Sequence, residues 1–376
     1  MNPIRKIAFL FEEFGVPSPS QQLLDRFLMG YPRDGTLHKP AVGAFVAYLP
    51  PTNEGGLERR KAEFNLDGAS TVEEAVEGAD AVVIVPRGSG ATANDRFVEI
   101  AVERAPEGAA CFIHGALTST LDRGHAVVKQ AAARRIALAS GTPLAVTWRL
   151  PGLEIPLETP LTEALIVVQK SPLQPGSYGT LAGAELCALD GLLPLVERRR
   201  GGESGVRSVR LLEGDAVWKG GDRKAWSWPL LAAALSRSHT PQGDPVRDGR
   251  TQDLVGLGLV PKLAKNPQAW LVDHRDGFRS AILVLDGVIA DFNVALRSAD
   301  ARIVSAQLFR APAPADQQFS LLAATVETFF TSRKAPWPVE RSLLTAGLLE
   351  AFRNPVTRTG KALATPHLDL AYRIAA

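Results

Sequence analysis

Long apolar runs are absent from the sequence of 376 residues, since no stretch approaches the ~18 consecutive apolar residues that a membrane-spanning helix needs. A strong charge of either sign is absent too. The 42 lysines and arginines stand against 40 aspartates and glutamates, which leaves a net charge of +2. This balance gives no bias toward nucleic acid or an anionic membrane surface, and we expect neither among the partners.

Cysteine and histidine are scarce, with two and six residues. Cys111 and Cys187 stand in apolar surroundings, so we expect buried free thiols rather than a disulfide or a metal pair. No HExxH, CxxC or local facial-triad spacing occurs, so any divalent metal would need ligands from distant segments, and this cofactor stays open. The apolar core near the N-terminus is short and is followed by Glu12 and Glu13, which excludes a signal peptide and predicts a cytoplasmic protein.

A short run of alanine, valine and isoleucine shows the plan of the first part of the chain. Residues 81–85 are apolar throughout and are closed by Pro86 and Gly88, which predicts a strand buried on both faces. Similar strands alternate with amphipathic helices from Ile4–Phe11 to Ile136–Ala139. This alternation predicts a doubly wound, Rossmann-like parallel sheet.

The pattern changes near Trp148, where the alternation with helices stops. Later strands are joined by the turns Arg275-Asp276-Gly277 and Asp286-Gly287, which predict consecutive hairpins and a large open, mainly antiparallel sheet. Such a sheet exposes an apolar face, so we expect a homo-oligomer, a dimer or tetramer, formed through it.

Three segments follow from this division of the chain. They are a Rossmann-like domain over 1–150, an antiparallel-sheet substrate or oligomerisation domain over 151–335, and a C-terminal helix and tail over 336–376 that packs back on the core.

The turn after the first strand lacks the glycines of a dinucleotide site. A G-x-G-x-x-G turn lets the backbone approach the pyrophosphate at a helix N-terminus. Here the turn reads Glu12-Glu13-Phe14-Gly15-Val16-Pro17-Ser18, with a single glycine and two carboxylates that repel a diphosphate. NAD or NADP therefore remains a candidate without its motif, and the residues placed to touch it are Gly15, Ser18, Pro86, Arg87 and Gly88.

The closing stretch of the chain carries a resemblance. Pro338-Val339-Glu340-Arg341-Ser342-Leu343-Leu344, then Gly347-Leu348-Leu349-Glu350-Ala351 and Ala364-Thr365-Pro366-His367, resemble the closing helix and tail of the Gfo/Idh/MocA family of sugar oxidoreductases. The strand AVVIVP resembles the family's D-x-V-x-I-x-T-P strand, and the layout is similar over nearly the whole chain. The resemblance implies an NAD(P)-dependent oxidoreductase that acts on a sugar or polyol.

Departures from the family concern the residues that carry its chemistry. The family's Glu-Lys-Pro motif follows the strand that here ends in His114-Gly115-Ala116, so the lysine is missing. Its later Asp and His pair would fall on the long helix, where Glu185 and Asp190 are available instead. Three hypotheses follow: an oxidoreductase with an atypical or degenerate NAD(P) site, a redox-silent lyase, isomerase or hydratase on a keto sugar with or without a metal, and a non-catalytic subunit or binding protein.

Candidates for acid–base catalysis are His114, Glu213, Asp215 and Lys219. His114 ends a buried strand at the ligand-binding edge, although a histidine hydrogen-bonded in a turn is the alternative. Glu213 and Asp215 would share one face of a strand, with Lys219 as a titratable amine, and a solvated strand end is the alternative.

Candidates for substrate binding are Thr147, Trp148, Arg149, Tyr178, Glu185 and Trp218. Arg149 suits a carboxylate, and the two tryptophans suit the face of a sugar. Tyr178 and Glu185 stand seven residues apart, on one face of the long helix. Interdomain packing is the alternative for the first three, and a packing tyrosine with a surface glutamate is the alternative for this pair.

Overall fold

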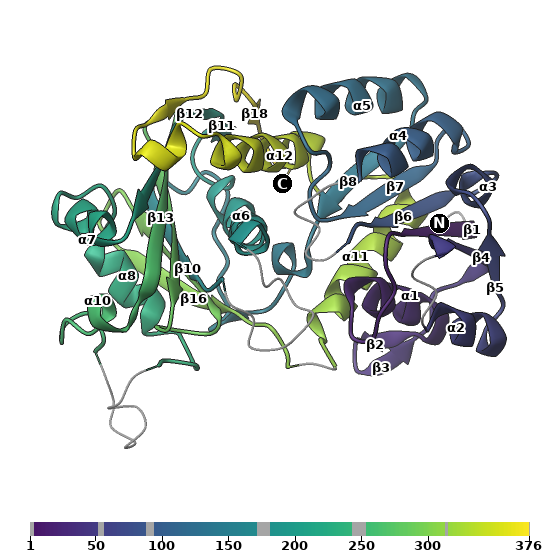
Figure 1. The fold of residues 1–376 in the computed structure, drawn as a ribbon, viewed down its shortest axis with the longest axis horizontal. Coiled ribbons are helices and arrows are strands. Elements are labelled where there is room, and N and C mark those ends of the chain that lie inside the picture. Colours follow the sequence, from purple (N-terminus) through teal and green to yellow (C-terminus); the bar gives the residue numbers. More distant parts are fainter. Residues whose placement is uncertain are drawn as a thin grey trace. The chain divides into compact units, whose positions relative to one another are not determined.

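The structure is a computed structural model, drawn in Figure 1, and it describes residues 4–51, 56–87, 94–170, 181–242, 253–312 and 315–375. The chain divides into two compact units. Unit 1 comprises Met1–Val146 and Ala311–Ala346, and unit 2 comprises Thr147–Arg310 and Gly347–Ala376. Helix α11 (Gln318–Ser332) thus joins unit 1 rather than the predicted second domain, because Phe319, Val326 and Phe330 pack into the core of unit 1.

Unit 1 is built on a six-stranded sheet in which every pairing is parallel. In spatial order the strands are β5 (Leu66–Ala69), β4 (Val42–Tyr48), β1 (Ile4–Phe11), β6 (Ala81–Val85), β7 (Ala110–His114) and β8 (Ala137–Gly141). The predicted Rossmann-like sheet is confirmed. Strand β5 is an addition that the sequence did not predict, because only Leu66 among its four residues is fully buried and no apolar run marks it.

Helices lie on both sides of this sheet (Figure 1). They are α1 (Pro19–Met29), α2 (Leu57–Glu63), α3 (Val72–Val76), α4 (Asp95–Arg104), α5 (Leu121–Ala133) and α11, with a short hairpin of β2 (Tyr31–Arg33) and β3 (Thr36–His38). Phe9 of β1 and Phe27 of α1 meet edge to face at 5.8 Å, and Phe27 in turn packs against Phe330 of α11. The α1–α11 side is therefore an aromatic layer.

Unit 2 is built on an eight-stranded mixed sheet. In spatial order the strands are β17 (Leu363–Ala364), β12 (Val206–Glu213), β13 (Lys265–His274), β14 (Arg279–Asp286), β10 (Leu161–Val168), β15 (Phe292–Ser298), β16 (Ile303–Leu308) and β9 (Arg149–Leu150). All neighbours are antiparallel except β10 and β14. This confirms the predicted, mainly antiparallel second sheet.

One predicted hairpin in this sheet is correct and the other is wrong. The turn at Arg275-Asp276-Gly277 joins β13 to β14 as an antiparallel pair. After Asp286-Gly287, however, β10 lies between β14 and β15, so these two strands do not pair. Val288 and Ile289 are buried in a core cluster, and β15 begins only at Phe292. Local turn chemistry cannot show that a distant strand is inserted between its flanking strands.

Helices of the same chain cover both faces of the unit 2 sheet. Helix α6 (Leu181–Val196) lies on one face, so close that a Cβ added at Gly191 would stand 2.4 Å from Leu308 and 3.3 Å from Ile166. On the opposite face, Leu165 and Val167 of β10 share a core cluster with α8 (Trp228–Leu235), α7 (Asp215–Asp222) and α10 (Val260–Leu263). The apolar face that we expected to be open is therefore covered by helices in the described part of unit 2. The homo-oligomer stays a prediction, but this face is no longer available as its interface.

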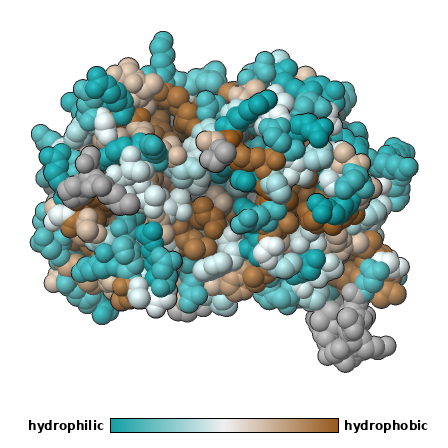
Figure 2. All heavy atoms as spheres, turned by 180° about the vertical axis from the view of Figure 1, so that it is seen from behind, coloured by the Kyte–Doolittle hydropathy of each residue, from teal (hydrophilic) through white to brown (hydrophobic). Residues whose placement is uncertain are grey.

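The remaining elements are short or close the chain. They are η2 (Pro143–Ala145), the pair β11 (Glu203–Ser204) and β18 (Ala371–Tyr372), α12 (Val339–Arg353) and η3 (Thr357–Thr359). Cys111 and Cys187 are buried free thiols, as predicted. Hydrophilic side chains make up most of the face in Figure 2, with hydrophobic ones between them, which is ordinary for a protein surface. Across the described residues, no helix has the length and apolar character to cross a bilayer.

Candidate functional site

The strand order of unit 1 reverses between β1 and β6, and in this fold ligands bind outside the carboxyl ends of such strands. Here the carboxylate of Glu12, which follows β1, bridges this edge. It accepts hydrogen bonds from the backbone N–H of Arg87 (2.7 Å) after β6 and from Nδ2 of Asn94 (2.6 Å), the N-cap of α4. The carboxylate therefore uses donors that an anionic ligand would need.

The N-terminus of α1 offers few further donors. Ser18 caps the helix, and its Oγ accepts from the N–H groups of Gln21 (3.2 Å) and Gly15 (3.4 Å). Pro19, the first helical residue, has no N–H. A Cβ added at Gly15 would meet nothing within 4 Å, so packing within the described chain does not require a glycine there. The arrangement differs from the bare helix start that binds a pyrophosphate.

The residues predicted to touch a cofactor are partly brought together at this edge. Gly15, Ser18 and Arg87 stand on the two loops that Glu12 joins, and Pro86 directly follows β6. The Arg87 guanidinium forms a long ion pair of 3.6 Å with Glu13. Gly88 lies outside the described residues.

His114 ends β7 and is completely buried. Its ring stacks on Phe319 of α11 with centroids 5.9 Å apart, and neither ring nitrogen has a hydrogen-bond partner in the part of the chain that the structure describes. Burial lowers the pKa of the imidazole to about 4, so the ring is neutral at pH 7. The residue predicted as a base is thus a buried histidine that is neutral at pH 7.

The predicted acidic face at Glu213 and Asp215 is corrected by the structure. Glu213 is the last residue of β12, Gly214 takes a positive φ of 56°, and Asp215 already begins α7. The chain turns between the two carboxylates, so they do not share a strand face. Glu213 accepts a hydrogen bond from Gln268 (2.6 Å) and pairs with Arg358 at 3.4 Å, while Asp215 and Lys219 are exposed on α7.

Glu185 is a predicted residue whose surroundings differ from those expected. It lies on α6, is 3% exposed, and accepts a 2.6 Å hydrogen bond from Nε1 of Trp270. Burial raises the pKa of its carboxyl to about 7, against which the Trp270 bond acts in the opposite sense. The alternative of a surface glutamate is therefore wrong. Tyr178, its expected partner on the helix face, lies outside the described residues.

The other predicted substrate-binding residues make contacts within unit 2. The hydroxyl of Thr147 donates to the backbone carbonyl of Phe309, and Trp148, which is 39% exposed, lies tilted against the Phe309 ring at 6.3 Å. Arg149, in β9, donates to the carbonyl of Leu153 at 3.1 Å. No group of three or more histidine, cysteine or acidic side chains suited to a metal occurs among the residues that the structure describes.

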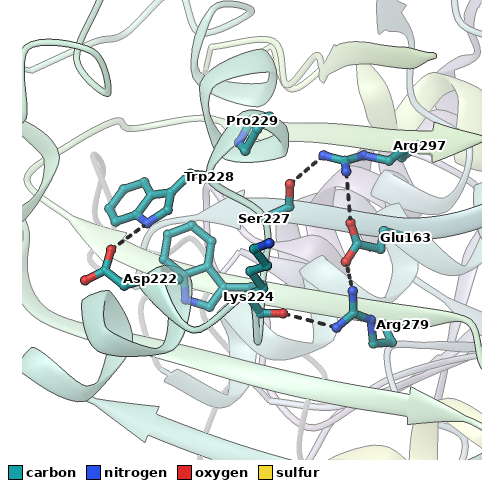
Figure 3. A pocket seen from close by; sticks show the side chains of 10 residues that line it. Glu163, Asp222, Lys224, Ser227, Trp228, Pro229, Arg279 and Arg297 are labelled. Carbon is teal, nitrogen blue, oxygen red and sulfur yellow. Dashed lines mark hydrogen bonds and ion pairs between the residues drawn. The ribbon is translucent and has the colours of Figure 1, made fainter. Parts of the chain in front are cut away.

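A cavity of about 580 Å³ lies on the α7–α8 side of the unit 2 sheet (Figure 3), and the sequence did not predict it. Its lining residues come from three strands and from the α7–α8 segment: Glu163, Gly221, Asp222, Lys224, Trp226, Ser227, Trp228, Pro229, Arg279 and Arg297. We call it the Glu163 pocket. Of the predicted residues, Trp218 lies next to it, with its ring stacked on Trp228 at 5.9 Å.

A row of charges crosses three neighbouring strands in the Glu163 pocket. Glu163 on β10 stands in register with Arg279 on β14 and with Arg297 on β15. Its carboxylate forms a close ion pair with Arg279 and a longer one of 3.8 Å with Arg297. Figure 3 shows the three side chains in line, with Glu163 in the middle.

The α7–α8 segment supplies the other wall of the Glu163 pocket. Trp226 and Trp228 pack with ring centroids 4.5 Å apart, and Nε1 of Trp228 donates to Asp222 at 3.2 Å. The carbonyl of Lys224 accepts from Arg279 at 3.1 Å, and Oγ of Ser227 accepts from Arg297 at 2.7 Å. These two bonds tie the segment to the row of charges on the sheet.

Neither a family model nor a curated protein sequence matches the chain. Solved structures match it over nearly its full length. A myo-inositol dehydrogenase from Lactobacillus casei in complex with NAD(H) and myo-inositol shares 10% identity with a TM-score of 0.60, and covers 99% of this chain and 98% of its own. A probable dehydrogenase from Thermotoga maritima shares 9% identity with a TM-score of 0.59, and the match covers 96% of this chain and 99% of that one.

A third match is GenD2 from gentamicin A biosynthesis in complex with NAD, with 12% identity, a TM-score of 0.58 and 97% of both chains covered. These likenesses establish the fold. The chain has the two-domain fold of NAD-dependent sugar and polyol dehydrogenases, and the predicted resemblance to the Gfo/Idh/MocA family is confirmed at the level of fold.

Proposed function

We propose that the protein acts on a sugar- or polyol-like molecule without hydride transfer, on a dehydrogenase scaffold whose NAD(P) site is degenerate. The substrate class rests on the fold, since the neighbours named above include a myo-inositol dehydrogenase and an enzyme of gentamicin biosynthesis. The reaction class that fits is elimination, hydration or isomerisation of an oxidised sugar.

The bridging carboxylate of Glu12 is the observation that carries this proposal. A dinucleotide brings two negative charges to the edge between β1 and β6, and Glu12 places a third at the same edge. Two like charges 4 Å apart near a protein surface repel each other by on the order of 4 kcal/mol. The start of α1 supports the same proposal. The Gln21 N–H already donates to Ser18 and Pro19 has no N–H, so fewer donors remain to offset this repulsion.

A second candidate is an oxidoreductase that binds NAD(P) in a non-standard way. It is favoured by a cavity of about 240 Å³ at the carboxyl ends of β4 and β5, where Lys61 pairs with Glu58 at 2.7 Å. A cation at the end of the second parallel strand suits an anionic ribose substituent. The third hypothesis, a non-catalytic subunit or binding protein, stays a prediction.

Titration calorimetry with NAD(H) and NADP(H) up to millimolar concentration separates these candidates. We expect no saturable binding to the wild-type chain. The variant Glu12→Gly frees the Arg87 amide and the Asn94 side chain, and Glu13→Gln serves as its matched control on the same loop. Saturable wild-type binding that Arg87→Gln weakens would overturn the proposal, whereas binding that only Lys61→Gln weakens would establish the second candidate.

A further inference from the structure

We propose that the Glu163 pocket binds a sugar that carries an anionic group, either a carboxylate or a phosphate. The pocket lies on the face of the unit 2 sheet opposite α6, and its residues belong to unit 2 alone. The inference is independent of the NAD(P) question, because no residue of unit 1 takes part in it.

The charged side chains that line the Glu163 pocket favour an anionic ligand. Two arginines and a lysine line the pocket, against the carboxylates of Glu163 and Asp222. Asp222 accepts from Trp228, and Glu163 is shared between Arg279 and Arg297. The pocket thus holds one cation more than its carboxylates balance, and the Lys224 side chain lies between Trp228 and the row of charges in Figure 3. An anion would complete this balance.

The guanidinium of Arg297 has hydrogen-bond donors that the described chain does not use. Arg297 stands 3.8 Å from Glu163, beyond hydrogen-bond distance, and donates one close bond, to Ser227. Its side chain lines the pocket and is 29% exposed, and its buried Nε has no acceptor among the described residues. A guanidinium carries five N–H donors in a planar fork that suits the two oxygens of a carboxylate or phosphate. Arg297 is therefore positioned by the chain but not saturated by it.

A purely structural cluster in the same unit looks different. The buried guanidinium of Arg199 donates to Asp276 through Nε (2.8 Å) and to both oxygens of Glu203 (2.9 and 3.1 Å). Each of its three nitrogens has a partner. Since the chain saturates one arginine so fully, the incomplete shell of Arg297 beside a cavity indicates a ligand rather than a fold-stabilising ion pair.

The aromatic wall and the size of the pocket point to a sugar. Trp228, which packs against the buried Trp226, presents apolar ring surface beside polar groups, the combination on which the C–H face of a sugar ring packs. The hydrogen bond of Trp228 to Asp222 fixes the ring orientation before binding, which reduces the entropy cost. A volume of about 580 Å³ lies within the range of small-molecule pockets and accommodates a monosaccharide.

Tryptophan fluorescence of the full chain provides the test, because Trp218, Trp226 and Trp228 lie in or beside the pocket. The probes are glucuronate, glucose 6-phosphate, neutral glucose and inorganic phosphate. We expect saturable quenching by at least one anionic sugar, at least tenfold weaker binding of glucose, and weaker binding at high salt. Tighter binding of glucuronate would indicate a carboxylate ligand, and tighter binding of glucose 6-phosphate would indicate a phosphate ligand.

Two variants and one control complete the experiment. Arg297→Gln should weaken binding of the anionic sugar at least tenfold, and Lys224→Gln, a change of an exposed side chain that leaves the sheet intact, should weaken it three- to tenfold. Arg223→Gln removes the neighbouring exposed cation outside the pocket and should change affinity less than twofold. Equal binding of glucose, equal binding of inorganic phosphate alone, or unchanged affinity in Lys224→Gln would overturn the proposal.

Discussion

The ligand edge of unit 1 and the Glu163 pocket of unit 2 each place one carboxylate between two neighbouring segments, with opposite results. Glu12 accepts from two neutral donors, the Arg87 amide and the Asn94 side chain, and adds a carboxylate to the edge. Glu163 stands between two arginines and leaves a net positive charge. Under the two proposals made above, a dehydrogenase-like fold has lost anion binding at its usual edge, while another face has the charges to bind an anion.

The largest expected effect concerns the saturated Arg199, set against the unsaturated Arg297. Arg199→Met removes a fully buried cation from Glu203 and Asp276 and should lower the free energy of unfolding by about 3 to 5 kcal/mol. Arg297→Met, in a partly exposed row, should lower it by about 1 kcal/mol or less. Urea denaturation measures both. Equal losses would show that Arg297 is structural and would break the comparison.

A second prediction concerns Glu185, whose buried carboxylate accepts a 2.6 Å hydrogen bond from Trp270. Its pKa is raised to about 7 in the folded protein, so the folded state favours its protonated form. Stability from this group is present below its ordinary pKa and is lost as pH rises through about 7. Glu185→Gln keeps an acceptor for Trp270 and should stabilise the protein by about 2 to 3 kcal/mol at pH 8, with little change near pH 4.5.

Urea unfolding of wild type and Glu185→Gln at both pH values measures this difference. Glu350→Gln, on α12, is a control that changes a carboxyl for an amide on another helix of the chain. A loss of stability at pH 8 in Glu185→Gln would contradict the prediction, because it would mean that the ionised carboxylate is well compensated where it is buried.

The smallest effect is expected at Glu12. Glu12→Gln retains one acceptor but directs an amide N–H group toward the donors of Arg87 or Asn94, and should cost about 1 to 2 kcal/mol of stability. Glu13→Gln, which removes only a long ion pair to Arg87, should cost less than about 0.5 kcal/mol. Thermal denaturation compares the two. A Glu12→Gln variant as stable as wild type would mean that the bridge does not hold the two loops together.

Much of the fold could be predicted because its signals are local. The run at residues 81–85 and the turn at Arg275-Asp276-Gly277 carry their structure in adjacent residues, and both are confirmed. Strand β5 could not be predicted, because edge pairing rather than an apolar pattern makes it a strand. The hairpin at Asp286-Gly287 failed because β10, far earlier in the sequence, inserts between β14 and β15.

The candidate sites were less predictable, because long-range register creates them. Arg279 meets Glu163 across 116 positions of sequence, and nothing in either neighbourhood marks the pair. The turn after β1 was correctly interpreted as lacking its glycines, yet the bridge from Glu12 to Asn94 depends on the packing of two loops. At Glu213 the error was local, since Gly214 ends a strand where continuation was expected.

Because helices α7 and α8 belong to the same chain as the sheet that they cover, the apolar face of unit 2 stays covered in dilute solution. When another subunit covers the apolar face of a sheet, the covering depends on subunit association and is lost as the protein concentration falls. Here the covering helices belong to the same chain, and Leu231 shares one buried core cluster with Leu165 and Val167. The effective concentration of these helices is therefore set by chain connectivity and is the same in a crowded cell as in a nanomolar assay.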